Sequence, residues 1–253
     1  MRVTVLGSGT SFGVPMIGCR CAVCTSSDPR DRRTRSSIHV QVREDFAFLV
    51  DTSIDLRQQA LANDLRRVDA VFYTHTHSDH VNGLDDLRSF NWLQRGPVHL
   101  HSRSDILDDI AMRFAHCFHP PQEGAGVPLI TLNPVTGPLT VGGVEVTPVP
   151  VKHGILDILG WRFDGFAYVT DASVIPEESM RLLEGVEVLI VNALRHEPHP
   201  THMSVGEALE VARRLRPRQT WFTHICHDLG HAATNAALPP EAQLAHDGLV
   251  FDV

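Results

Sequence analysis

Short apolar runs alternate with turn-forming segments at the beginning of the chain, and this pattern predicts a β-rich first segment. Three short apolar runs have strand character: Val3 to Leu6, Ile38 to Val42 and Phe46 to Val50. Helical spacing of apolar residues follows, interrupted by one short buried-strand run, Ala70 to Tyr73. The predicted helices of this half are Asp55 to Leu65, Gly83 to Leu93 and Asp105 to Phe114.

The second half of the chain repeats this order of strands followed by strands mixed with helices. The predicted strands are Leu129 to Leu132, Val144 to Val151, Phe166 to Val169, Val186 to Val191 and Gln219 to Thr223. The predicted helices are Pro176 to Leu183 and Ser204 to Leu215, and Ser204 with Glu207 has the spacing of a capping box. This order, met twice, predicts an α/β fold in which two mixed β-sheets are sandwiched between helices.

Composition is that of an ordinary globular protein and limits the possible functions. The 253 residues are 43% hydrophobic and 21% charged, and no change in composition divides them, so we expect one domain over residues 1–253. The first residues lack the features of a signal peptide and no apolar run is long enough to span a membrane, so a cytoplasmic location without membrane association is expected. A formal net charge of -8 disfavours a stable nucleic-acid partner.

Four potential metal ligands lie within six residues, directly after the predicted strand Ala70 to Tyr73. They are His75, His77, Asp79 and His80. Imidazole and carboxylate are donors that zinc, iron and manganese accept, and four of them are too many to be satisfied as ordinary core side chains. The segment therefore predicts a metal site in the loop that leaves the carboxyl end of this strand.

One such loop cannot saturate two metal ions, so further ligands are expected after other strands. Three downstream residues meet this expectation, each following a predicted strand: His153, Asp171 and His224. Together with the first loop they form a set that suits two divalent metals, although the ligand types leave the identity of the metals open.

In the order of these residues the chain resembles the metallo-β-lactamase superfamily, whose members carry a His-x-His-x-Asp-His loop, a later His, a bridging Asp and a last His. The resemblance implies the following ligands: His75, His77 and His153 on one metal, Asp79, His80 and His224 on the other, and Asp171 between them. Redox di-iron relatives have a glutamate at the position of His77, so hydrolysis is expected rather than oxygen chemistry.

Hydrolysis at phosphorus needs a nucleophile and a proton for the leaving oxygen. Two metals lower the pKa of a shared water, so a bridging hydroxide is the expected nucleophile and no nucleophilic side chain is required. His202, just before the capped helix, is the candidate general acid, and Asp79 is counted with it in the catalytic set. His196 and His199 are nearby alternatives with weaker claims.

A second cluster consists of three closely spaced cysteines, Cys19, Cys21 and Cys24. This spacing favours metal ligation over a disulfide framework, and a closed tetrahedral zinc site needs a fourth donor. His227, in the downstream string His224-Ile225-Cys226-His227, is our choice. Such a zinc would pin the N-terminal loop to the strand that bears His224 without taking part in the chemistry. The alternative is three free buried thiols.

The cysteine cluster, His202 and the segment Thr223-His224-Ile225-Cys226-His227 narrow the resemblance. Over nearly the whole chain they look like the cyclic-phosphate phosphodiesterases of the carbon-phosphorus lyase pathway for phosphonate breakdown. This likeness implies an αββα sandwich of the metallo-β-lactamase fold, two catalytic manganese or zinc ions, one structural zinc and a homodimer. It also implies a small phosphodiester or cyclic phosphate as substrate, with phosphoribosyl 1,2-cyclic phosphate as one candidate.

Other functions stay open. A transfer-RNA 3′ processing endonuclease shares the metal loops, but the chain has no visible basic insertion, and its acidic balance disfavours this reading. A non-catalytic metal-binding sensor module has the same fold, although a decayed site would lose some ligands. Thioester and lactam hydrolysis remain alternatives, because metals polarise a carbonyl oxygen as well as a phosphoryl oxygen.

Two loops carry separate expectations. Residues 114–127 break the helical pattern, and both a lid over the active face and an ordinary surface connection are open interpretations. Arg32, Arg33 and Arg35 could meet a phosphate, but a solvated basic run is the favoured interpretation.

Overall fold

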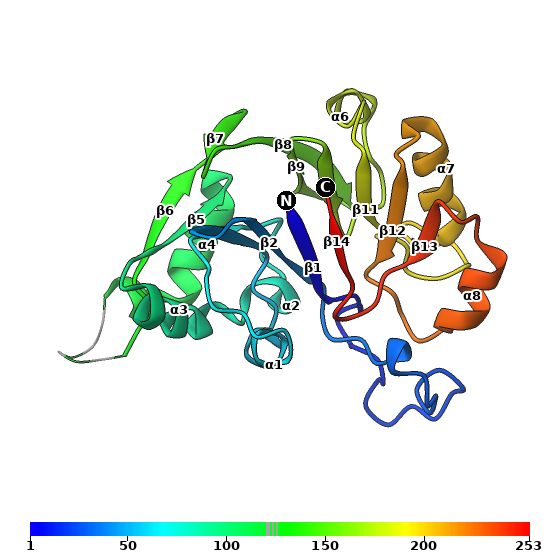
Figure 1. Cartoon of the computed structure of the whole chain (residues 1–253), viewed down its shortest axis with the longest axis horizontal. Coiled ribbons are helices and arrows are strands. Elements are labelled where there is room, and N and C mark those ends of the chain that lie inside the picture. Colours follow the sequence, from blue (N-terminus) through cyan, green and yellow to red (C-terminus); the bar gives the residue numbers. More distant parts are fainter. Residues whose placement is uncertain (120–121, 123, 125) are drawn as a thin grey trace.

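The computed structural model describes residues 1–119, 122, 124 and 126–253, and they form an αββα sandwich. Within this part of the chain two seven-stranded mixed sheets share a hydrophobic core, and helices lie outside them (Figure 1). The first sheet has the order β14-β1-β2-β3-β4-β5-β6, and the second has the order β13-β12-β11-β10-β9-β8-β7. The predicted fold of two mixed sheets flanked by helices is confirmed.

The first sheet contains both ends of the described chain. Its strands are β1 (Arg2–Gly7), β2 (Ser37–Arg43), β3 (Phe46–Val50), β4 (Ala70–Phe72), β5 (Val98–Ser102), β6 (Ile130–Pro134) and β14 (Val250–Asp252). Pairing is antiparallel from β14 through β3 and parallel from β3 through β6. Because β14 pairs with β1, the N- and C-termini lie side by side (Figure 1).

The second sheet follows the same plan. Its strands are β7 (Leu139–Val141), β8 (Val144–His153), β9 (Leu156–Phe163), β10 (Phe166–Val169), β11 (Val188–Asn192), β12 (Gln219–Thr223) and β13 (Ala242–Leu244). Pairing is antiparallel from β7 through β10 and parallel from β10 through β13. Each sheet thus has a parallel half, and the carboxyl ends of parallel strands share one edge, where ligands can gather.

Helices cover the outer sides of both sheets. They are α1 (Leu56–Ala62), α2 (Ser78–Val81), α3 (Leu87–Gln94), α4 (Ser104–Arg113), α5 (Ala115–Phe118), α6 (Glu177–Leu182), α7 (Val205–Leu215) and α8 (His231–Ala237), with the 3₁₀ turns η1 (Pro29–Asp31) and η2 (Leu84–Asp86). Helices α3 and α4 contact β5 of the first sheet, whereas α6 and α7 contact β8 and β11 of the second. The predicted capping box of α7 is present, with both Ser204 and Glu207 hydrogen bonds formed. Among the described residues, no helix is long and apolar enough to cross a membrane.

Strand β10 is buried on both faces, which explains its unbroken apolar sequence. Phe166 faces the core between the sheets, whereas Ala167 and Val169 face the core beneath the helices of the second sheet. Aromatic rings join the two sheets, since Phe48 of β3 and Phe163 of β9 have ring centroids 4.6 Å apart. Burying a side chain of this size contributes about 1.5–3 kcal/mol, so the strand ends that carry the site are held by a tightly packed frame.

Elements with a strong apolar period match their predictions within a few residues, and those without one were missed. The missed elements include β5, β7, β9, α8, β13 and β14. In β9, Asp157, Gly160 and Arg162 interrupt the apolar run, and pairing with β8 and β10 holds the strand. The lid hypothesis for 114–127 remains a prediction. The segment begins with helix α5, and its residues 120, 121, 123 and 125 lie outside the described residues.

Candidate metal centre

The predicted metal ligands come together where strand ends of both sheets meet. They are His75, His77, Asp79 and His80 after β4, His153 at the end of β8, Asp171 after β10 and His224 after β12. The first segment was predicted to be a loop, but this is wrong for Asp79 and His80, which lie in the short helix α2. Their ligand atoms form two groups, and within each group all atoms lie within 4.8 Å of one another. The two groups contain the residues named above for the two metal positions, with Asp171 in the second group, and the binding of metals by them stays a prediction.

The first group consists of three imidazoles from two strand ends: His75, His77 and His153. Nε2 of His75 lies 3.0 Å from Nδ1 of His77. His153 contributes from the second sheet, and its Nδ1 lies 2.8 Å from the backbone oxygen of Thr201. That contact orients the His153 ring and leaves Nε2 as the nitrogen for a metal.

The second group consists of Asp79, His80, Asp171 and His224, and Asp171 lies between the two groups. Its Oδ1 is 3.1 Å from Nδ1 of His224 and 3.5 Å from Nε2 of His80. Its Oδ2 is 3.9 Å from Nε2 of His75, which belongs to the first group. A carboxylate whose two oxygens face different imidazole sets has the placement that a bridging ligand of a two-metal site requires.

His80 gives the clearest test of whether these donors suit a cation. Its ring is fully buried, and Nδ1 lies 2.7 Å from Oδ2 of Asp51. Nε2 has no hydrogen bond but faces oxygens of Asp79 and Asp171 at 3.3 and 3.5 Å. Burial lowers the pKa of His80, but the carboxylates of Asp171, Asp79 and Asp51 outweigh burial and raise this pKa well above its ordinary value. A metal at Nε2 would replace that proton among the same carboxylates, so the donors fit a divalent cation.

Three other ligands already have the protonation states that bind metals. Burial lowers the pKa of His75 well below its ordinary value, and burial also lowers the pKa of His224 to about 4. Burial opposes ionisation of Asp171, but His224 and His80 outweigh it and hold the pKa of this carboxyl well below its usual range. Neutral imidazoles and an ionised carboxylate therefore present free lone pairs near neutral pH.

Asp51 is a residue of the site that sequence reasoning missed. It is fully buried directly after β3, and the backbone N–H and hydroxyl of Thr74 donate to its two oxygens, both at 2.8 Å. Its contact with Nδ1 of His80 makes it an outer carboxylate that orients a metal-binding imidazole. The sequence did contain a feature that could have identified Asp51, because this aspartate follows the apolar strand that ends at Val50. Asp171 was identified from the same feature.

Three residues of the centre share a left-handed backbone conformation. Asp51, Asp171 and His224 have φ angles of 61°, 58° and 55°, and each lies within two residues of the end of a strand. This conformation costs residues other than glycine about 1–2 kcal/mol, although Asp and His adopt it more readily than most. The strain lies where the chain turns sharply to aim these side chains at the shared edge.

His202 lies beside both groups but comes from the loop that precedes α7. Its Nε2 is 3.4 Å from Oδ2 of Asp171. Its Nδ1 lies 2.9 Å from the hydroxyl of Thr201 and 3.3 Å from Nδ1 of His199. His199 therefore contacts His202 rather than the ligand groups, and His196 is exposed to solvent. Of the three candidate histidines, His202 is the one whose ring nitrogen contacts a ligand of the centre.

A cavity of about 550 Å³ opens beside His75 and His77. Its size is within the range of small-molecule sites. Arg103 and Arg113 line it, and their ion-pair partners are Asp105 and Asp109, at 2.5 and 2.8 Å. The remaining wall residues are Thr76, Ile106, Ile155, Leu156, Asp157 and Ile158. The cavity combines an apolar wall with charged groups next to the first metal position.

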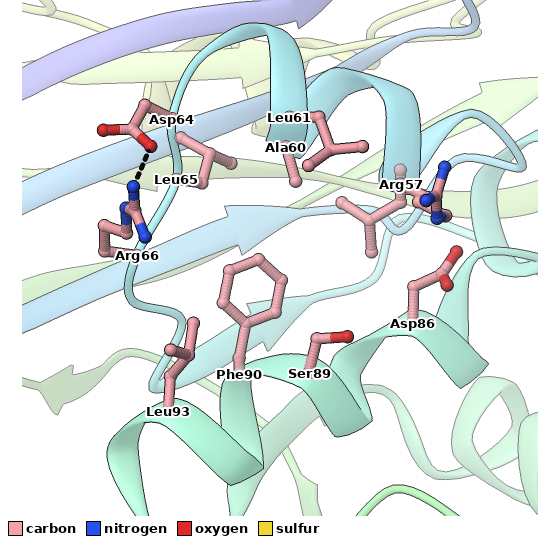
Figure 2. A pocket seen from close by; sticks show the side chains of 11 residues that line it. Arg57, Ala60, Leu61, Asp64, Leu65, Arg66, Asp86, Ser89, Phe90 and Leu93 are labelled. Carbon is pink, nitrogen blue, oxygen red and sulfur yellow. Dashed lines mark ion pairs between the residues drawn. The ribbon is translucent and has the colours of Figure 1, made fainter.

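A second hollow, of about 340 Å³, lies between α1 and α3 (Figure 2). Leu61, Leu65 and Phe90 are among the side chains that line it, and an ion pair between Asp64 and Arg66 stands at one side. None of the candidate metal ligands lines this hollow. This hollow is therefore separate from the candidate metal centre.

The cysteine cluster assembles with the predicted fourth member. Ligand atoms of Cys19, Cys21, Cys24 and His227 lie within 4.8 Å of one another, and Nδ1 of His227 is 3.2 Å from Sγ of Cys19 and 3.4 Å from Sγ of Cys21. The backbone N–H of Cys24, followed by His227, lowers the pKa of Cys21 to about 6. Burial raises the pKa of the neighbouring Cys24 to about 11, so within the cluster the thiolate form, which binds zinc, is favoured at Cys21. All of the cysteines are free of disulfides.

Arg33 also joins the N-terminal loop to the loop after β12. Its guanidinium is buried and donates to the backbone oxygens of Cys226 at 3.0 Å and Leu229 at 2.7 Å, beside Asp31 at 3.0 Å. The interpretation of Arg32, Arg33 and Arg35 as a solvated run is therefore wrong at Arg33. The loop needs this buried anchor because it has no regular sheet pairing of its own.

Comparison with known proteins agrees with this geometry. A family model described as a beta-lactamase superfamily domain matches residues 47–225. The chain belongs to the beta-lactamase superfamily. The match begins within β3 and ends just after His224, so it covers part of each sheet and the seven candidate ligands of the histidine-aspartate centre.

Relatives within the superfamily differ in their names. The crystal structure of a diphosphatase from the PhnP family has 43% sequence identity and a TM-score of 0.92, with 100% of this chain and 97% of that chain covered. An octanoyltransferase of Porphyromonas gingivalis is 36% identical over 98% of this chain, which spans only 51% of that protein. Coenzyme PQQ synthesis protein B of Methylobacterium nodulans is 30% identical over 75% of this chain and 72% of that protein. These likenesses support a metal-dependent hydrolase resembling the PhnP family.

Proposed function

We propose that this protein is a binuclear metal-dependent phosphodiesterase that hydrolyses a small phosphodiester or cyclic phosphate. The observation that carries the proposal is the convergence of seven nitrogen and oxygen ligands with His202, together with a cavity of about 550 Å³ that His75 and His77 line. The similarity to a diphosphatase supports a phosphorus centre as the electrophile. Phosphoribosyl 1,2-cyclic phosphate is one substrate of this class.

The proposed ligands are those in the two groups of the centre. His75, His77 and His153 would hold one metal, Asp79, His80 and His224 the other, and Asp171 both. Two manganese or zinc ions would polarise the phosphoryl oxygen and lower the pKa of a water molecule. Asp51 keeps His80 in the orientation that exposes Nε2 to the centre.

His202 is the proposed proton donor to the leaving oxygen. Thr201 and His199 contact its Nδ1, so the ring is held with Nε2 toward the centre. General acid catalysis of this kind contributes about 10²–10⁴-fold in rate. Asp79, on α2 beside His80, is proposed as the second member of the catalytic set through its place in the ligand group.

Two further proposals concern stability and assembly. Cys19, Cys21, Cys24 and His227 would hold one structural zinc. The expected partners are the small phosphate substrate and a second copy of the chain in a homodimer, with no stable nucleic-acid partner. Light scattering of the purified protein tests the homodimer directly.

The decisive experiment compares substrates on protein of measured metal content. Bis(p-nitrophenyl) phosphate and a ribosyl 1,2-cyclic phosphate are offered with and without added manganese. We expect metal-dependent opening of the cyclic phosphate. Well-metallated protein that leaves both compounds intact contradicts the proposed function and shifts weight to a nuclease or a non-catalytic role.

Acyl hydrolysis is a second candidate, because an octanoyltransferase aligns with nearly the whole chain. The same metals could polarise a thioester carbonyl, and the apolar wall of Ile155 and Leu156 could accept an acyl chain. An octanoyl thioester in the same assay separates the candidates. Faster turnover of the thioester than of either phosphodiester would favour acyl chemistry.

A further inference from the structure

A third cluster of metal-binding side chains lies outside both sites described above. Asp85 comes from the turn η2, and His116 and Cys117 come from helix α5. Nε2 of His116 is 2.8 Å from Oδ1 of Asp85 and 3.5 Å from Sγ of Cys117. Sγ of Cys117 is 3.8 Å from the same Asp85 oxygen. Three different donor atoms therefore converge on one point from two segments about thirty residues apart in sequence.

This arrangement is not that of a proton relay. In a Cys-His-Asp relay the thiol and the carboxylate contact opposite nitrogens of the imidazole, so that a proton can pass through the ring. Here Asp85 and Cys117 both approach Nε2 of His116. A ring that meets both partners at one nitrogen cannot transfer a proton between them, but it can share one cation with them.

The spacing of the donors is close to that around tetrahedral zinc. Zinc bond lengths of ~2.0–2.3 Å place neighbouring ligand atoms roughly 3.3–3.6 Å apart. The three separations here are 2.8, 3.5 and 3.8 Å. In the cysteine cluster, the distances from His227 to Cys19 and Cys21 are 3.2 and 3.4 Å. Small side-chain movements would bring the third cluster to the same spacing.

The donor types indicate which metal the cluster would take. A thiolate with an imidazole and a carboxylate suits zinc, whereas manganese and magnesium favour oxygen ligands. The side chains of His116 and Asp85 are 42% and 43% exposed, so a bound ion would keep a position open to water. Burial, followed by Asp85, raises the pKa of the Cys117 thiol to about 12, so binding must displace a proton and will be weaker at low pH.

We propose that Asp85, His116 and Cys117 form a third, exchangeable zinc site. Asp85 stands five residues after the ligand His80, so the ion would join the turn behind α2 to α5. The site would thereby fix the beginning of segment 114–127 against the element that carries Asp79 and His80. It shares no residue with the two catalytic groups or the cysteine cluster.

The test follows the Cys117 thiol in the whole, metal-loaded protein. Alkylation by iodoacetamide is measured at this cysteine by peptide mass, with and without added zinc. We expect zinc to slow the alkylation of Cys117 at least about tenfold in the unaltered protein. Asp85→Asn and His116→Gln keep the thiol but remove one donor each, so both should abolish most of this protection.

His99→Gln is the matched control. His99 is an exposed histidine on β5 whose Nδ1 contacts Thr131, and it belongs to none of the clusters of candidate metal ligands. The control should retain zinc protection of Cys117, and metal analysis should find one more zinc bound in it than in His116→Gln. Alkylation that zinc does not change in the unaltered protein, or protection that survives both donor substitutions, overturns the proposal.

Discussion

The two main metal-binding regions of this molecule are built in opposite ways. The histidine-aspartate centre is buried except for His77, and strand ends of both sheets with the short helix α2 supply its ligands. The cysteine cluster is partly exposed, and a single loop outside the sheets supplies three of its four members. The histidine-aspartate centre therefore depends on the packing of both sheets, whereas the cysteine cluster depends on one local loop and one residue distant in sequence, His227.

This difference teaches what each region depends on. Ligands on rigid strand ends keep their positions when an ion leaves, and Asp51 holds His80 independently of any metal. The cysteine loop lacks such support, apart from the buried Arg33 and a few backbone hydrogen bonds. We therefore expect metal loss to abolish activity at the first region and to reduce stability at the second.

Asp171→Asn is expected to have the largest effect. The change keeps the shape of the side chain but removes the charge that faces both ligand groups, so activity should fall by about four orders of magnitude and metal content should fall as well. Asp164→Asn is the control, because Asp164 also has a left-handed backbone but lies in the turn between β9 and β10. Metal analysis with turnover of a phosphodiester gives the answer, and an active, fully metallated Asp171→Asn protein would contradict the bridging role.

His202→Ala should lower turnover by about two to three orders of magnitude while metal content stays nearly intact. The reason is that His202 faces the centre but lies outside both ligand groups of the two-metal arrangement. His199→Ala, which removes only a contact to His202, should have a smaller effect. Normal turnover of the His202→Ala protein would remove this residue from the mechanism.

Cys21→Ala should separate the second region from the first. We expect loss of about one zinc per chain and of about 3 kcal/mol of unfolding free energy, or roughly 6–12 °C in Tm. Turnover by the folded protein should change little. Cys226→Ser is the control, because Cys226 adjoins His227 in sequence but contacts Asp228 instead of the cluster. Equal zinc content in both variants would mean that the thiols hold no zinc.

Asp51→Asn should have the smallest effect of the four. The variant removes the charge that orients His80 but leaves every proposed ligand in place, so metal affinity or activity should fall by about 10–100-fold. Activity measured during a titration with manganese or zinc gives the metal affinity of the variant and of the unaltered protein. Unchanged affinity would show that packing alone orients His80.

The sequence by itself determined the elements with strong periodicity and the residue types of both metal regions. Strands such as β3, β4 and β10 were predictable because their apolar runs are unbroken and their ends are marked by polar residues. The ligands were predictable because the segments that carry them begin just after such runs. The cysteine cluster was predictable from spacing alone, since three of its members are neighbours in the chain.

Only the tertiary structure decided how these pieces combine. Strand β14 pairs with β1, which lies at the other end of the sequence, and β9 pairs with both β8 and β10. These pairings define the two strands, and neither strand has a clear apolar pattern of its own. The role of Asp51 depends on β3 lying next to β4, which brings Asp51 to Thr74 and His80. Arg33 is buried because the N-terminal loop folds over the turn after β12. The physical reason is common to all of these: local pattern sets which way a residue faces, but its partners are set by sheet order, and sheet order is non-local.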